Sequence, residues 1–271
     1  RRTKEDDAAI EDYLAKFKKS SFISACIVGA LGIITGIFQI ISAASISINN
    51  VGFLSLGINF IAILAAGFVS KDVIITGLKS LIYLKSNRDS LPSLAMAGSL
   101  IQIVFLFFSA LIYSSDTNLF ILAPVAILSM AFHHGAKYLL AVRCIHNLQT
   151  ISSREEMYGS DIVESEELAA DLTKGTIYKK PFVAYNRKTS FITNFVYHSF
   201  LDDMSDRISF FLAPAAALTS LVLFFITICV SGSVFESATI LSACLCLFAP
   251  FGLMLSIQAP LYSLSKENDE S

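Results

Sequence analysis

The run "ISFFLAPAAALTSLVLFFITICVS" at residues 208–231 contains no charged side chain. A hydrocarbon core about 30 Å thick requires roughly 20 apolar residues of helix, so this run is long enough to cross a bilayer. Over the 271 residues, hydrophobic residues make up 54% and charged residues only 15%, whereas about 25% of an ordinary soluble domain is charged. We therefore expect an all-α, polytopic membrane protein with the lipid bilayer as its surroundings.

Six apolar runs of about this length with almost no charge are present, and they fall into three pairs. The connections "SINN" (47–50), "SSDTN" (114–118) and "SGSVFE" (231–236) lack Lys and Arg, whereas the intervening connections are rich in both. Because positively charged residues stay on the cytoplasmic side, this pattern predicts a multi-pass protein of the cell membrane with both termini in the cytoplasm. The expected spans are 20–46, 52–69, 91–113, 118–143, 207–231 and 236–261.

The remaining residues divide into cytoplasmic segments. Residues 71–86, "KDVIITGLKSLIYLKS", have apolar residues at helical spacing, which favours either an interfacial helix or an extension of the second span. Residues 144–206 form a small α+β segment, with a helix-like stretch "ESEELAADL" and a strand-like stretch "PFVAYN". A segment of this size is only marginally stable alone. Residues 1–19 and 262–271 complete the division as an N-terminal cytoplasmic segment and a cytoplasmic tail.

Composition and motifs exclude several classes of function. The net charge of -2 gives no basic footprint for nucleic acid. The five cysteines lie mostly in apolar runs, which argues against a secreted disulfide framework. The charged residues that follow Arg1 indicate a trimmed fragment without a cleavable signal peptide. The common phosphate-loop, metalloprotease and serine-hydrolase motifs are absent.

Four local motifs occur in an order that resembles the membrane region of the heavy-metal (type IB) P-type ATPases. That family has two spans, an interfacial helix, two further spans, a cytoplasmic actuator domain and a last pair with a Cys-Pro-Cys motif. The motifs are "SNRDSLPSLAMAGS" with Asn87, Asp89 and Leu91, "HGAKYLLAVR" with Lys137, Tyr138 and Leu139, "DRISFFLAP" with Asp206, Arg207, Ile208, Ser209 and Pro214, and "ACLCLFAP" at 243–250.

The resemblance implies a cation-transporting membrane domain, with Cys244 and Cys246 as the candidate ligands of a transported soft metal cation and no cofactor in this chain. The departures from the family pattern concern catalysis. Residues 144–206 lack the Thr-Gly-Glu loop and are too short for a full actuator domain. The Asp-Lys-Thr-Gly-Thr phosphorylation site is also absent, and Leu140 replaces an acid. We therefore expect a degenerate relative without ATP hydrolysis in this chain.

The two cysteines cannot bind one ion together from a regular helix. Residues two apart are separated by about 200° around the helix axis, so Cys244 and Cys246 face nearly opposite ways. Leu245 stands where the family has a proline that unwinds the helix. Pro250 leaves the carbonyl of Cys246 without its helical donor, which suggests either a partial ion site or a kink satisfied by neighbouring helices. Thiols also pack as small hydrophobic groups.

Other polar residues of the expected spans have structural and functional interpretations. His133 and His134 are candidate ligands or proton carriers near the cytoplasmic end of the fourth span. Pro260 frees the carbonyl of Ser256 near Gln258, which has the same two interpretations as the break at Pro250. Gln102 and the hydroxyls near residues 218–220 are expected to form interhelical hydrogen bonds. The acids Asp202, Asp203 and Asp206 are expected to cap the fifth span, and Glu164–Asp171 to form a solvated helix face.

Two further hypotheses for the function remain besides the ATPase-like module. One is a non-enzymatic membrane scaffold that presents residues 144–206 to a cytoplasmic protein partner. The other is a secondary carrier, which the absence of an evident inverted repeat disfavours.

Overall fold

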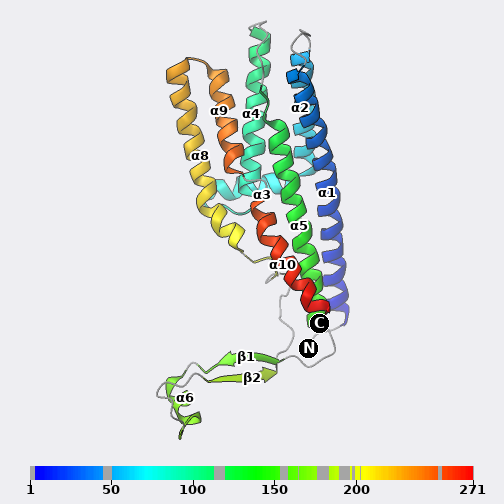
Figure 1. Ribbon diagram of the computed structural model, residues 1–271, viewed down its shortest axis with the longest axis vertical. Coiled ribbons are helices and arrows are strands. Elements are labelled where there is room, and N and C mark those ends of the chain that lie inside the picture. Colours follow the sequence, from blue (N-terminus) through cyan, green and yellow to red (C-terminus); the bar gives the residue numbers. More distant parts are fainter. Residues whose placement is uncertain are drawn as a thin grey trace.

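The protein is a bundle of long helices with a small segment beyond one end of it (Figure 1). This segment contains two paired strands with a short helix between them in the chain, and we call it the hairpin segment. The computed structural model describes residues 4–44, 51–112, 120–152, 158–163, 165–175, 183–188, 196, 199–201, 203–249 and 252–270. In chain order the elements are α1 (Lys4–Ala44), α2 (Val51–Val69), α3 (Lys71–Ile82), α4 (Ser90–Ile112), α5 (Ala123–Ser152), β1 (Tyr158–Ile162), α6 (Glu166–Leu172), β2 (Ala184–Lys188), α8 (Met204–Ser231), α9 (Val234–Phe248) and α10 (Leu253–Glu270).

Among the residues that the structure describes, five stretches of helix are long and apolar enough to cross a membrane, and a bent pair would make up to six. The bent pair is α2 with α3, whose described parts meet at 83°. This angle agrees with an interfacial helix after the second span and disagrees with a straight extension of that span. The helical, membrane-compatible architecture expected from the composition is therefore present, with α3 ending at Ile82 rather than residue 86.

The last expected span, 236–261, is not one continuous helix. α9 ends at Phe248 and α10 begins at Leu253, although together they still make one apolar crossing. Gly252 has a φ of 128°, a conformation that glycine adopts at little cost. The fourth span also differs from expectation, because its helix begins at Ala123 rather than at residue 118.

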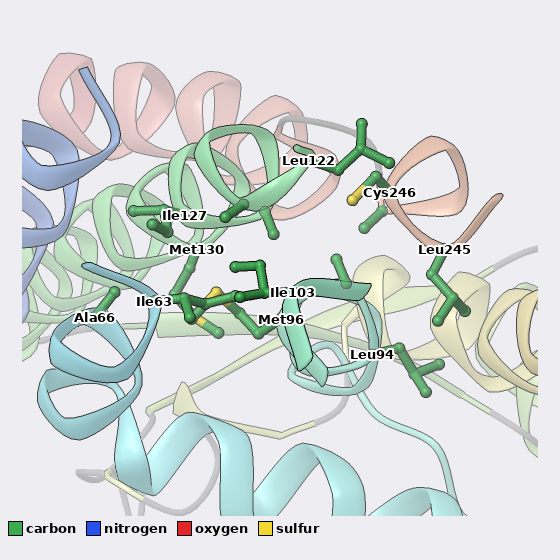
Figure 2. Close-up of a cluster of buried hydrophobic side chains, with 14 of the residues drawn as sticks. Ile63, Ala66, Leu94, Met96, Ile103, Leu122, Ile127, Met130, Leu245 and Cys246 are labelled. Carbon is green, nitrogen blue, oxygen red and sulfur yellow. The ribbon is translucent and has the colours of Figure 1, made fainter. Parts of the chain in front are cut away.

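The main core lies between α2, α4, α5 and α9. Figure 2 draws part of this buried cluster, in which Ile63, Met96, Ile127 and Leu245 come from these four helices in turn. The outer face of α8 has many exposed apolar side chains, such as Phe211, which is 76% exposed. An apolar surface of this kind is typical of contact with lipid rather than water.

A second core joins three helices below the main bundle, and we call this part the stalk. α1 has 41 residues, or roughly 60 Å at 1.5 Å per residue, about twice the thickness of a hydrocarbon core. Its first turns pack against α5, and the start of α10 packs against the same part of α5, around Leu14, Leu140, Leu148 and Met254. The stalk, the start of α1 and the end of α10 lie at one end of the molecule (Figure 1). The N-terminal segment 1–19 is therefore helical over its described part.

The segment expected at 144–206 begins inside α5 and ends in the first turn of α8. It contains the antiparallel pair β1–β2, in which Tyr158 pairs with Lys188 and Ile162 with Ala184. Its helix α6 lies within the stretch predicted as helical, and β2 overlaps the strand-like "PFVAYN". In Figure 1 the hairpin and α6 lie apart from the bundle, beyond the end of the stalk.

The close packing of α3 on α4 depends on Gly77. A Cβ atom at this position would overlap the backbone oxygen of Asp89 and Oγ of Ser93. We expect Gly77→Ala to lower the free energy of unfolding by about 1–3 kcal/mol, because the backbone of Asp89 must move. Denaturation of the purified protein in detergent measures this change.

Gly135→Ala is the matched control, because nothing lies within 4 Å of a Cβ atom there. Equal stability of the two alanine variants would show that the contact between α3 and α4 is not tight.

Candidate functional site at the helix breaks

The two cysteines of "ACLC" lie on different sides of α9. Sγ of Cys244 is 3.9 Å from Oγ1 of Thr219 on α8. Sγ of Cys246 is 3.6 Å from Oγ of Ser99 on α4. Both side chains are buried, and Figure 2 draws Cys246 within the main core. α9 is a regular helix here, so the thiols face apart, as their spacing predicts.

The groups next to Cys246 are hydroxyls. Oγ of Ser99 lies 3.1 Å from Oγ of Ser242, which joins α4 to α9. Hydroxyls are hard ligands, whereas soft cations prefer thiolates and thioethers. Within the described residues, no three His, Cys, Asp or Glu side chains are grouped so that they could hold a metal ion. In this arrangement the cysteine pair has no common position at which one ion could contact both thiols.

The break between α9 and α10 borders a small cavity. Pro250 lies outside the described residues, so its part in the break stays a prediction. On the near side of the break, Oγ of Ser129 on α5 donates to the carbonyl oxygen of Ala249 at 3.4 Å. The cavity has a volume of about 20 Å³, enough for about one water molecule. Its lining includes Arg88, His133, Ser205 and Gly252.

Asp89 lies beside this cavity, in the turn before α4, and is buried with two partners from α5. Its Oδ1 is 2.7 Å from Nε2 of His133 and 3.0 Å from Nζ of Lys137. Burial alone would raise the pKa of the Asp89 carboxyl. The hydrogen bond from His133 and the charge of Lys137 outweigh burial and hold this pKa well below its ordinary value. Asp89 is therefore ionised at neutral pH.

Arg88 joins the same turn to the start of α8. Its backbone N–H donates to Oδ1 of Asp206 at 2.9 Å, and its guanidinium lies 3.6 Å from Asp203 and 3.8 Å from Asp206. Asp203 and Asp206 also form a capping box at the N-terminus of α8, which confirms their predicted capping role. Asp202 lies outside the described residues. Nε2 of Gln258 on α10 donates to Oδ2 of Asp203 at 2.6 Å.

These contacts form one group, which we call the charge cluster. It contains three carboxylates, two permanent cations and one imidazole, and it connects the α3–α4 turn with α5, α8 and α10. Its members are Arg88, Asp89, His133, Lys137, Asp203 and Asp206. Buried charges are expensive unless they are paired, and a cluster of them is a candidate functional site.

Local hydrogen bonds hold the turn that carries Arg88 and Asp89. The backbone N–H of Asn87 donates to Oγ of Ser90 at 3.0 Å, and that of Asp89 to Oδ1 of Asn87 at 3.1 Å. Oγ of Ser90 donates to the carbonyl of Gly77 on α3 at 3.2 Å. The turn is therefore fastened to α3.

The neighbouring histidine of α5, His134, joins a different pair of helices. Nε2 of His134 lies 2.9 Å from Oγ of Ser70 at the end of α2. Both side chains are buried. This contact joins α5 to the residue between α2 and α3, so His134 has a hydrogen-bond partner within the protein. Its role as a ligand or proton carrier stays a prediction.

Gln102 supports a second non-helical stretch, the one before α5. Its Nε2 donates to the carbonyl of Phe120 at 2.8 Å, and its Oε1 accepts from the N–H of Leu122 at 3.1 Å. Gln102 is fully buried. Backbone groups inside a bilayer need protein partners, and this amide supplies two. The predicted hydrogen-bonding role of Gln102 is confirmed, with backbone as the main partner and Thr239 of α9 as an additional one at 3.4 Å.

The structure brings together residues from three of the four motifs. Asp89, Lys137 and Asp206 meet in the charge cluster, together with the candidate His133. Arg207 is exposed. Sequence reasoning counted Arg88 only as a topology signal and missed its part in the cluster. The available signal was a charged pair, Arg88 and Asp89, directly before an apolar run.

Comparisons of this chain with protein family models, curated proteins and solved structures found no match. The site is therefore interpreted from its own residues.

Removing the charge of Asp89 tests the cluster. Asp89→Asn leaves the buried ammonium of Lys137 without its counter-charge, so we expect the free energy of unfolding to fall by about 3–5 kcal/mol. Adding Lys137→Met should restore part of this loss, because no buried charge then remains in that pair. Because the pKa of the Asp89 carboxyl is lowered by folding, its contribution to the free energy of unfolding is complete above the ordinary pKa of an aspartate. This contribution is lost progressively as the pH falls below that value.

Asp171→Asn is the matched control, because Asp171 on α6 forms an exposed ion pair with Lys174 in the turn that follows this helix. Such surface pairs contribute little. If Asp89→Asn were as stable as Asp171→Asn, the cluster would not support the bundle.

Proposed function

We propose that this chain is a membrane module that resembles the membrane domain of heavy-metal P-type ATPases and keeps its helix scaffold. In this proposal the chain neither hydrolyses ATP nor holds a soft cation between its two cysteines. One observation carries it: the α2–α3 bend and the α9–α10 break accompany a buried charge cluster. Interrupted helices are characteristic of transporters, where the break lies against protein or a cavity, and here the α9–α10 break borders the small cavity lined by Arg88 and His133.

The order of elements supports the resemblance. A first pair of helices is followed by the sharply angled α3, a second pair, the hairpin segment and a last pair whose second helix is broken. The break begins at Ala249, three residues after Cys246, whereas the resemblance implies an unwound helix between the two cysteines. Placement in a cell membrane with both termini in the cytoplasm belongs to this proposal, and it agrees with helix ends that lie at one end of the molecule (Figure 1).

Two features support a scaffold without ion binding at the cysteines. Cys244 and Cys246 contact different helices, and Leu245 between them is buried in the main core. In addition, Arg88 and Lys137 already neutralise carboxylates of the charge cluster. A site for a transported cation needs acceptors that are open to it, whereas these carboxylates are paired with the chain's own cations.

Metal binding tests this proposal. The experiment uses a variant in which Cys26, Cys144 and Cys229 are replaced by Ser, so that only the pair Cys244 and Cys246 remains. After equilibration with Cu(I) or Zn²⁺ and removal of free metal, we expect the same metal content with and without the additional changes Cys244→Ser and Cys246→Ser. Elemental analysis of the purified protein measures this.

A bound ion that disappears in either single substitution would show that both thiols reach it. That result would contradict the proposed degenerate module and would show that the two cysteines form a cation site.

A second candidate function is the membrane scaffold that presents residues 144–206 to a cytoplasmic partner. One observation favours it: the β1–β2 pair and α6 lie apart from the helix bundle (Figure 1). A cytoplasmic labelling enzyme fused after Ser271 should mark neighbouring proteins in cells. We expect the loss of specific neighbours when residues 158–188 are replaced by a Gly-Ser linker.

An unchanged set of neighbours would exclude the scaffold. Absence of any cytoplasmic labelling would contradict the proposed orientation.

A further inference from the structure

α3 has one face packed on the bundle and one face that the protein leaves uncovered. Val73 and Gly77 are buried, and Oγ of Ser93 on α4 donates to the carbonyl of Val73 at 3.2 Å. The opposite side and the turn after it form what we call the outer face of α3. Its members are Lys71, Ile75, Lys79, Ile82, Tyr83, Leu84 and Lys85, all of them exposed.

The apolar side chains of the outer face are largely exposed, which would be unfavourable if only water surrounded them. Ile75 is 62% exposed, Ile82 79%, Tyr83 66% and Leu84 75%. Leu84 also has a φ of 55°, a conformation that costs free energy for a residue with a Cβ atom. A large apolar side chain is thus held outward at a strained position, which indicates an apolar environment outside the protein.

The place of α3 in the fold identifies that environment. Only Ser70 separates α3 from the end of the apolar helix α2, and the two helices meet at 83°. A helix at nearly a right angle to a membrane-spanning helix runs along the bilayer surface (Figure 1). Tyrosine is enriched at this depth, where an apolar ring and a polar hydroxyl are both accommodated.

The charges of the outer face select the kind of lipid. Lys71, Lys79 and Lys85 alternate with the apolar residues, and Asp72 is the single acid of α3. In the described part of the chain, none of these three lysines forms an ion pair. Lysine stems lie along apolar surface while the ammonium groups reach outward. Ammonium groups near a bilayer surface attract anionic headgroups.

We propose that the outer face of α3 binds anionic phospholipid, with the three lysines at the headgroup phosphates and Ile75, Ile82 and Leu84 at the acyl boundary. Each lysine that reaches a headgroup favours anionic over zwitterionic lipid by roughly five-fold. The inference requires that the chain is embedded in a membrane but does not depend on ion transport, so it stands or falls separately from the metal-binding test.

The absence of tryptophan from the sequence allows a local measurement. Tyr83→Trp places one fluorescent reporter on the outer face. The full chain is reconstituted in phosphatidylcholine vesicles that contain increasing amounts of brominated phosphatidylglycerol or brominated phosphatidylcholine, and quenching by the two lipids is compared. We expect the brominated phosphatidylglycerol to associate several-fold more strongly with the introduced indole than the brominated phosphatidylcholine does.

Replacing Lys71, Lys79 and Lys85 by Gln in this background should make the two lipids quench equally. Lys174→Gln, which removes an exposed lysine from the turn after α6, should leave the preference unchanged. A second reporter, Phe225→Trp on an exposed position of α8, should show no preference, because Arg207, the one basic residue of α8, lies five turns away.

Equal quenching by both lipids in the lysine-containing protein would overturn the proposal, as would a preference that survives the triple substitution. Lack of quenching by either lipid would also overturn it, because the outer face would then not contact the bilayer.

Discussion

The carboxylate of Asp89 is the contact on which the arrangement of the helices depends. Lys137 brings a buried positive charge from α5 into an apolar bundle, and an ammonium group there is tolerable only beside a counter-charge. The preceding residue, Arg88, makes the equivalent pairing with the two acids at the start of α8. One short turn thus determines how α3, α4, α5 and α8 meet, and through Gln258 it also reaches α10.

The same pairing shapes the functional interpretation. Buried carboxylates can bind a passing cation only while they are not paired with a positively charged side chain of the protein itself. Here Arg88 and Lys137 lie within 4 Å of all three carboxylates of the charge cluster. The paired charges are therefore the reason why the proposed module is a scaffold and not a working cation site. In the further proposal, the outer face of α3 is the part of the same region that contacts lipid.

Several features could be predicted from local sequence because their cause is local. The charge-free run of α8 is sufficient for a membrane helix, and Asp203 and Asp206 cap it through contacts within four residues. The opposite directions of Cys244 and Cys246 follow from helix geometry alone. The interfacial direction of α3 was one of two alternatives, because its amphipathic pattern does not determine the angle to α2.

Features that depend on distant partners could not be predicted in this way. The first turns of α1 are charged, and their helix is stabilised by Leu14, which is buried against α5 in the stalk. The non-helical stretch before α5 is acceptable in a bilayer because Gln102, on another helix, bonds its backbone. The apolar run at 236–261 reads as one span, although the structure divides it between Phe248 and Leu253.

The sequence by itself determined the class of the protein, the approximate place of its apolar helices and the caps and faces that arise within a few residues. These properties follow from side-chain polarity and helical periodicity, which a single segment carries. Only the tertiary structure decided that Arg88 and Asp89 face different helices, that each meets an opposite charge, and that Cys244 lies against α8 and Cys246 against α4. Those outcomes depend on which helices pack together, because an ion pair or a buried contact between two helices requires residues from both of them.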